Sequence, residues 1–132
     1  MNEYTQSAIL TATPEKLVQM LYERAIELVN EAIENVENSE VRNSSLTRAQ
    51  EIVLYLNAVL NMEKGGEIAK NLRALYDFIY RELVDGNVKA DREKLKSVKD
   101  LLAELLDTWK EVEKRAKVRP AVVQSGGFNA SA

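Results

Sequence analysis

The sequence predicts an all-α protein, an elongated antiparallel up-down four-helix bundle with a loose N-terminal segment and a loose C-terminal tail. Apolar residues recur every three to four positions through four long segments, which is the period of an amphipathic helix. Adjacent glycines, Gly65 and Gly66, interrupt an otherwise helix-forming stretch near the middle of the 132-residue chain. The connections between segments are short, so consecutive helices should be antiparallel neighbours.

The first helix should begin near Pro14. Thr13, Pro14 and Glu15 supply an N-cap, a proline at the first helical position and an acid in the first turn. The apolar residues that follow cover an unusually wide face of this helix, which indicates contact with more than one neighbour. They are Leu17, Val18, Leu21, Tyr22, Ala25, Ile26, Leu28, Val29, Ala32, Ile33 and Val36.

The second helix is expected after a polar loop that runs from Glu37 to Asn43, with Ser44 or Ser45 as its N-cap. Its apolar residues are Leu46, Ala49, Ile52, Val53, Leu56, Val59 and Leu60. Glycine inside a helix costs roughly 1 kcal/mol relative to alanine, so the Gly65-Gly66 pair predicts a tight reversal between the second and third helices.

The third helix should end at Asp85-Gly86-Asn87, because Gly86 can adopt the left-handed conformation of a C-cap. The fourth should begin near Asp91 and carry the apolar residues Leu95, Val98, Leu102, Leu105, Trp109, Val112 and Ala116. Residues 1–117 therefore form one predicted bundle domain, in which segment 1–13 has no clear period. Residues 118–132 form a predicted flexible tail.

The composition argues against catalysis. The chain has no Cys and no His, so thiolate chemistry, the commonest general base and the commonest metal ligand are all missing. A two-metal carboxylate site in a helical bundle uses Glu-x-x-His pairs, which this chain cannot supply. The Gly65-Gly66 pair also lacks the surroundings of a phosphate-binding loop. We expect no enzyme activity, no cofactor and no metal.

The charge pattern argues against nucleic acid as a partner. The net charge of −3 comes from interspersed acidic and basic residues and includes no basic stripe. No apolar stretch reaches the roughly 18 residues of a membrane span, and the N-terminus lacks the features of a signal peptide. The expected setting is cytoplasmic, with no membrane association and with a protein or peptide partner.

A docking groove is predicted along the second and third helices, where apolar residues remain outside the core stripes. If the chain reverses at the glycines, residues whose numbers sum to about 131 lie level with each other. Leu54 should then approach Phe78, and Asn57 should approach Ala74. Small alanines would form the floor, apolar side chains the walls, and asparagines would hydrogen-bond a bound backbone. The predicted groove residues are Leu54, Asn57, Ala58, Asn61, Asn71, Ala74 and Phe78.

The alternative is that these residues widen the core or lie singly on the surface, which is normal for apolar side chains. The tyrosines Tyr22, Tyr55, Tyr76 and Tyr80 are expected at the core edge with hydrated hydroxyls, and Trp109 is expected in the core.

Three motifs are specific to a known family. They are Thr11-Ala12-Thr13-Pro14 at the start of the first helix, Met20-Leu21-Tyr22 within it, and Met62-Glu63-Lys64-Gly65-Gly66 at the predicted reversal. With further matches from Tyr4 to Trp109-Lys110, almost everything before the tail resembles FliS, the family of flagellin-specific export chaperones.

The resemblance implies a cytoplasmic four-helix chaperone with no nucleotide. Such a protein would bind the disordered C-terminal segment of flagellin, prevent its premature polymerisation and deliver it to the flagellar type III export apparatus. By the same analogy, Tyr4, Ile9, Leu10 and Thr11 would belong to an N-terminal cover over the client site. The alternative function is a self-associating structural bundle, a homodimer joined through the apolar flanks and without a client.

Overall fold

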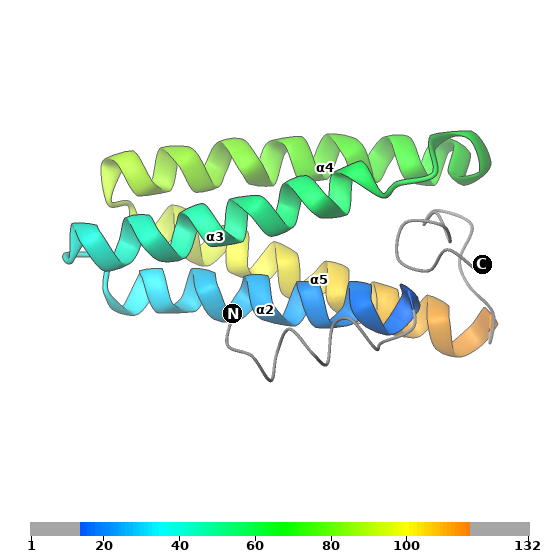
Figure 1. Cartoon of the computed structure of the whole chain (residues 1–132), viewed down its shortest axis with the longest axis horizontal. Helices are drawn as coiled ribbons and strands as arrows, with labels where there is room; N and C mark the ends of the chain where they lie inside the picture. Colours follow the sequence, from blue (N-terminus) through cyan, green and yellow to red (C-terminus); the bar gives the residue numbers. More distant parts are fainter. Residues whose placement is uncertain (1–13, 117–132) are drawn as a thin grey trace.

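Four helices run antiparallel along one another in the computed structural model, which describes residues 14–116 (Figure 1). They are α2 (Pro14–Glu34), α3 (Ser39–Ala58), α4 (Met62–Lys89) and α5 (Arg92–Ala116). The predicted all-α class and the elongated up-down bundle are confirmed. The predicted loose N-terminal segment and the tail 118–132 lie outside the described residues.

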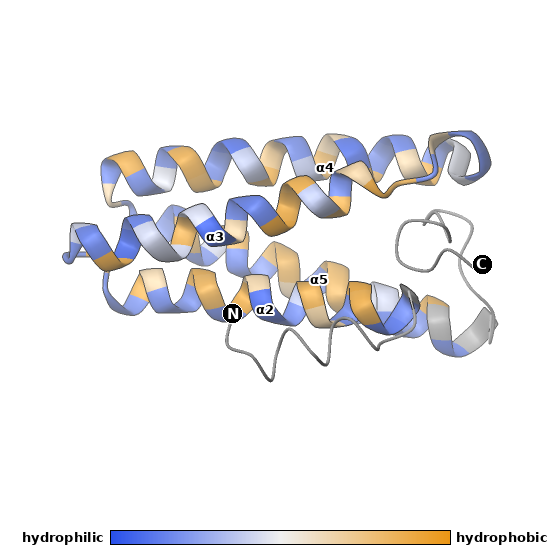
Figure 2. Ribbon diagram, in the orientation of Figure 1, coloured by the Kyte–Doolittle hydropathy of each residue, from blue (hydrophilic) through white to orange (hydrophobic). Residues whose placement is uncertain are grey.

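Each helix packs mainly against two neighbours. Helices α2 and α4 each contact both α3 and α5. The α3 to α4 connection lies at one end of the bundle, and the other two connections lie at the opposite end (Figure 1). Apolar and polar residues alternate along every helix (Figure 2), and the apolar side chains meet in one core. The largest fully buried side chains include Leu28, Leu46, Leu56, Ile79, Leu83, Leu95 and Leu102.

The first helix begins at Pro14, as the sequence predicts. Trp109 of α5 is buried, which confirms its predicted place in the core. Its indole Nε1 donates a hydrogen bond to the carbonyl oxygen of Glu15 at 3.2 Å. This bond ties the later turns of α5 to the first turn of α2.

The start of α3 corrects the predicted loop between Glu37 and Asn43. The helix begins at Ser39, and Asn38 is its N-cap, with the side chain accepting from the Val41 amide at 3.1 Å. Asparagine is among the best N-caps, so a polar run that follows it can enter a helix as an exposed first turn. The predicted cap at Ser44 or Ser45 is therefore wrong.

The reversal between α3 and α4 occurs earlier than predicted. The connection is residues 59–61, and Asn61 caps α4 by accepting from the Lys64 amide at 2.9 Å. Gly66 lies inside α4 as a kink, with φ 54° and ψ −132°, a conformation that only glycine adopts without a steric cost. Gly66 therefore bends the chain about one turn after the start of α4. The two glycines do not form the connection between α3 and α4.

Gly86 does not end α4. The helix continues to Lys89, and Ala90 takes the left-handed C-cap conformation with φ 50° and ψ 45°. A Cβ atom on Gly86 would lie 2.6 Å from Cδ2 of Leu95, closer than packed carbon atoms approach. The glycine is needed for the close contact of α4 with α5, and the predicted C-cap at this position is wrong.

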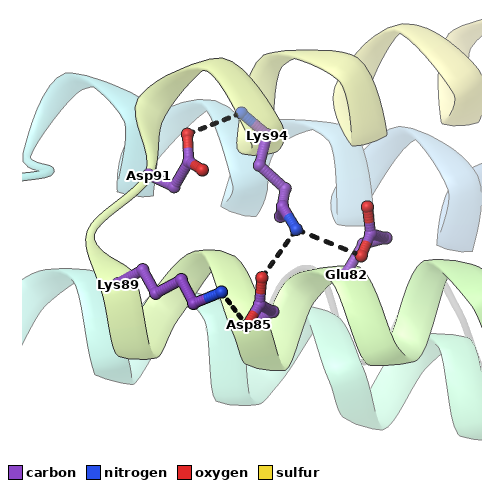
Figure 3. Close-up of polar contacts among 5 residues, drawn as sticks. All are labelled: Glu82, Asp85, Lys89, Asp91 and Lys94. Carbon is purple, nitrogen blue, oxygen red and sulfur yellow. Dashed lines mark hydrogen bonds and ion pairs between the residues drawn. The ribbon is translucent and has the colours of Figure 1, made fainter.

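An ion cluster joins the same two helices (Figure 3). Nζ of Lys94 on α5 lies 2.6 Å from Asp85 Oδ2 and 3.4 Å from Glu82 Oε2, and Lys89 lies 3.2 Å from the other oxygen of Asp85. The hydrogen bond from Lys94 lowers the pKa of Asp85, and the same bond raises the pKa of Lys94. Packing at Gly86 and charge pairing at Lys94 together fix how α5 begins against α4.

Candidate docking groove

A shallow furrow lies between α3 and α4 and contains a pocket of about 200 Å³. We call it the α3/α4 furrow. It is lined by Val53, Leu54 and Asn57 of α3 and by Tyr76, Asp77, Tyr80 and Arg81 of α4. The antiparallel helices are held in register by contacts between their side chains, such as the 2.9 Å bond that Asn87 of α4 donates to Asn43 of α3.

Leu54 and Asn57 are the two predicted groove residues that line this pocket. The Leu54 side chain is 52% exposed, so it leaves apolar surface available to a partner. Asn57 Nδ2 donates to Asp77 Oδ1 at 2.9 Å. A carboxylate can only accept, so this bond fixes the orientation of the Asn57 amide. The Asn57 Oδ1 atom is buried and has no hydrogen-bond partner among residues 14–116.

Ala58 and Asn61 lie just beyond the pocket, at the end of α3 and in the connection. Ala58 is exposed, so it is not part of the core. The Asn61 side-chain oxygen accepts from the Lys64 amide, so this acceptor already serves as the α4 cap.

Phe78 and Ala74 of α4 are not among the residues that line the pocket. Phe78 precedes Glu82 by one helical turn, so the two share a side of the helix, and Glu82 pairs with Lys94 of α5. Ala74 lies one turn before Phe78, and Asn71 lies on the same side. All three are exposed, with Phe78 at 44%. The structure thus divides the predicted groove, and Phe78 does not line the pocket beside Leu54.

Asp77, Tyr80 and Arg81 line the furrow but were not among the predicted groove residues. The signal for them was present, because the predicted antiparallel register already places Leu54 level with Asp77. Arg81 follows Asp77 by one turn and therefore lies on the same side. The helical pattern did not show how the third helix is rotated about its axis, and therefore which of its faces points towards the second helix.

A buried tyrosine of the α3/α4 furrow is bonded to a second buried tyrosine of α2. Tyr76, 3% exposed, lines the pocket from below and shares a hydrogen bond between hydroxyl groups with Tyr22 of α2, 2% exposed. Burial raises the pKa of Tyr76 to about 12 and raises that of Tyr22 well above its usual value. Both side chains stay neutral at physiological pH and join α2 to α4 through the core. The expectation of hydrated hydroxyls is wrong for this pair.

Over residues 14–116, His, Cys, Asp and Glu side chains form no group of three or more that could hold a metal ion. None of the helices in this part of the chain combines the length and apolar character needed to cross a bilayer. The predicted cover residues Tyr4, Ile9, Leu10 and Thr11 lie outside the described range.

The fold defines an all-α four-helix bundle, and an open pocket lies between α3 and α4 with the buried Tyr76 in its lining. The family model described as flagellar protein FliS matches residues 1–116, and the chain belongs to the FliS family. The resemblance drawn from the sequence motifs is thereby confirmed.

Several curated relatives are similar over most of their length. The flagellar secretion chaperone FliS of Bacillus subtilis is 34% identical over 110 residues, which cover 82% of this chain and 81% of the relative. The protein of the same name from Salmonella typhimurium is 34% identical over 114 residues, 84% of each chain. The one from Vibrio cholerae is 36% identical over 108 residues, 80% of this chain and 79% of the relative. FliS is a family of chaperones and not of enzymes, which agrees with the expectation from composition.

Proposed function

We propose that this chain is a cytoplasmic secretion chaperone that binds the C-terminal segment of flagellin. It keeps that segment from polymerising prematurely and delivers it to the flagellar type III export apparatus. Membership of the FliS family and the names of the curated relatives support the chaperone role. The flagellin client, the export apparatus and the cytoplasmic setting follow from the resemblance of the motifs.

The observation that carries this proposal is the α3/α4 furrow with its half-exposed Leu54. A disordered client that orders on binding loses about 1 to 2 kcal/mol of backbone entropy per residue, so it needs a long apolar contact. The 20 residues of α3 provide a helix about 30 Å long, and α4 runs beside it. The two helices together offer a polypeptide a long surface, and the pocket of about 200 Å³ is one position along it.

The first test is the effect of the full-length protein on flagellin polymerisation, followed by light scattering. Wild-type protein in excess should suppress assembly, and Leu54→Glu should suppress it much less, because a carboxylate would be desolvated against the client. Val112→Glu places the same charge on an exposed valine of α5 and should behave as wild type. Equal suppression by both variants would exclude the furrow as the client site.

The predicted groove residues that do not line the pocket remain a predicted part of the client surface, and variants of two of them test this. Ala58→Glu and Ala74→Glu should weaken client binding and leave helicity intact, since both alanines are exposed. If only Ala58→Glu weakens binding, the client contacts the end of α3 and not the surface of α4 that bears Ala74.

The N-terminal cover also belongs to the proposal. If Tyr4, Ile9, Leu10 and Thr11 occupy part of the client site in the free protein, deleting residues 1–10 should tighten client binding modestly, because the covered state no longer competes. An unchanged or weaker affinity would reject the cover.

Self-association is the second candidate function, and exposed apolar side chains favour it. Leu54 and Phe78 are both about half exposed, so a second copy could pack against the same apolar flanks in place of a client. Sedimentation of the protein alone separates the two functions. A homodimer that excludes the flagellin segment would support the structural role, whereas a heterocomplex that persists on dilution would support the chaperone.

A further inference from the structure

A second pocket, of about 190 Å³, lies on the opposite flank of α3, between α3 and α2. Its apolar floor is formed by Leu21 and Leu28 of α2, which are buried, and by the partly buried Ile52 of α3. Two arginines line it from facing helices, Arg24 from α2 and Arg48 from α3.

The two guanidinium groups have little charge compensation within the described part of the chain. Arg24 lies 3.9 Å from the exposed carboxylate of Glu27, which is the long limit for an ion pair and adds little energy at a surface. Arg48 makes no ion pair with any residue of the range 14–116. Glu51 is the single acidic residue that lines the pocket, so the lining carries a net positive charge.

The size and chemistry of this pocket limit what it can hold. Small-molecule sites usually exceed roughly 300 Å³, so this pocket has room for about one side chain. An apolar floor beside two arginines is complementary to an apolar side chain with a carboxylate attached next to it. The last residue of a polypeptide has this arrangement, because its α-carboxylate and its side chain share one Cα atom. Aspartate and glutamate side chains lack the apolar part.

We infer that this pocket binds the C-terminal residue of the client, with Arg24 and Arg48 holding the α-carboxylate and the floor holding the terminal side chain. This inference rests on the proposed function, since it takes the flagellin C-terminal segment as the client. Arginine pairs carboxylates through two parallel hydrogen bonds, which gives direction as well as charge. The position is also suitable, because Arg48 and Leu54 are six residues apart on α3, about 9 Å along the helix. A client that lies in the α3/α4 furrow can therefore end on the other flank of the same helix.

Two synthetic peptides test the inference by calorimetric titration of the full chain. Both carry the C-terminal segment of flagellin from the same organism, one with a free α-carboxylate and one with a C-terminal carboxamide. The carboxamide should bind about tenfold more weakly, the loss expected for one charge-assisted contact. Raising the salt concentration should reduce this difference.

Variants of the arginines show whether the difference arises in this pocket. Arg48→Gln and Arg24→Gln should each weaken binding of the acid peptide and bring the two peptides to nearly equal affinity. Arg92→Gln makes the same charge change on an exposed residue at the start of α5 and should keep the tenfold difference. Arg48→Lys retains the charge without the planar fork, so it should restore part of the difference.

Equal affinities of the acid and amide peptides for the wild-type protein would overturn the inference and leave the proposed function standing. So would a difference that persists unchanged in Arg48→Gln and Arg24→Gln. A concentration-dependent mass that Arg48→Gln abolishes would assign the pocket to a second copy of this chain, which also overturns it. Failure of both peptides to bind would reject the proposed function together with the inference.

Discussion

Removing one hydroxyl from the buried Tyr22–Tyr76 pair should destabilise the protein, whereas removing both should not. Tyr76→Phe leaves the Tyr22 hydroxyl buried, in a residue only 2% exposed, without its partner. An unsatisfied buried hydroxyl costs about 1 to 3 kcal/mol, and replacing both partners by apolar groups of the same shape can be nearly neutral. The rings remain in the variants, and their centroids are 6.5 Å apart, so the aromatic contact is kept.

The assay is urea unfolding of the full chain, followed by circular dichroism, for wild type, both single variants and the double variant. Each single variant should lose about 1 to 3 kcal/mol of unfolding free energy. The double variant should lie within about 1 kcal/mol of wild type, so single losses near 2 kcal/mol would give a coupling energy of about 3 to 4 kcal/mol. Single variants as stable as wild type, or losses that simply add in the double variant, would refute the hydrogen bond between the two hydroxyls.

Three further predictions concern pH and the contact between α4 and α5. Burial raises the pKa of Tyr76 to about 12, against about 10 in an unfolded chain. The neutral Tyr76 hydroxyl therefore contributes its full stabilisation below about pH 10, and this stabilisation is lost as the pH rises towards 12. Between pH 10 and pH 12, wild type should therefore lose about 2 kcal/mol more unfolding free energy than the double phenylalanine variant, and equal losses in urea titrations would contradict this. Lys94→Met should lower the urea midpoint at pH 7. Because Lys94 lowers the pKa of Asp85, the difference in urea midpoint between the variant and wild type should shrink as the pH falls through that pKa. A difference that does not change with pH would contradict this prediction. Gly86→Ala should cost about 1 kcal/mol net by urea unfolding, since crowding against Leu95 outweighs the gain in helix propensity; a more stable variant would show that α4 and α5 can separate there.

The sequence predicts the helices well where local signals and packing agree. The start of α2 at Pro14 follows from capping chemistry alone, and the apolar stripe of α5 predicts that Trp109 is buried. Gly86 was misassigned because its role is tertiary. Its missing side chain makes room for Leu95, which lies nine residues later on another helix, and no local pattern contains that information.

For a related reason, only two of the residues that line the pocket between α3 and α4 were among the predicted groove residues. The helical period correctly places Leu54 outside the core, but it does not say which neighbour lies on which side of α4. Asp77 bonds to Asn57 of α3, and the next residue, Phe78, is rotated by about 100° around the helix axis. A single groove in the prediction thus becomes two flanks in the structure. The pocket between α2 and α3 was missed because Arg24 and Arg48 come from separate segments of ordinary amphipathic pattern.

Calorimetric titration of this protein with the C-terminal segment of flagellin from the same organism, repeated at several temperatures, tests the central claim most directly. A client that folds along the α3/α4 furrow buries a large apolar area, so binding should be one-to-one with a strongly negative heat-capacity change. The absence of binding at high protein concentration would contradict the chaperone function proposed for this bundle.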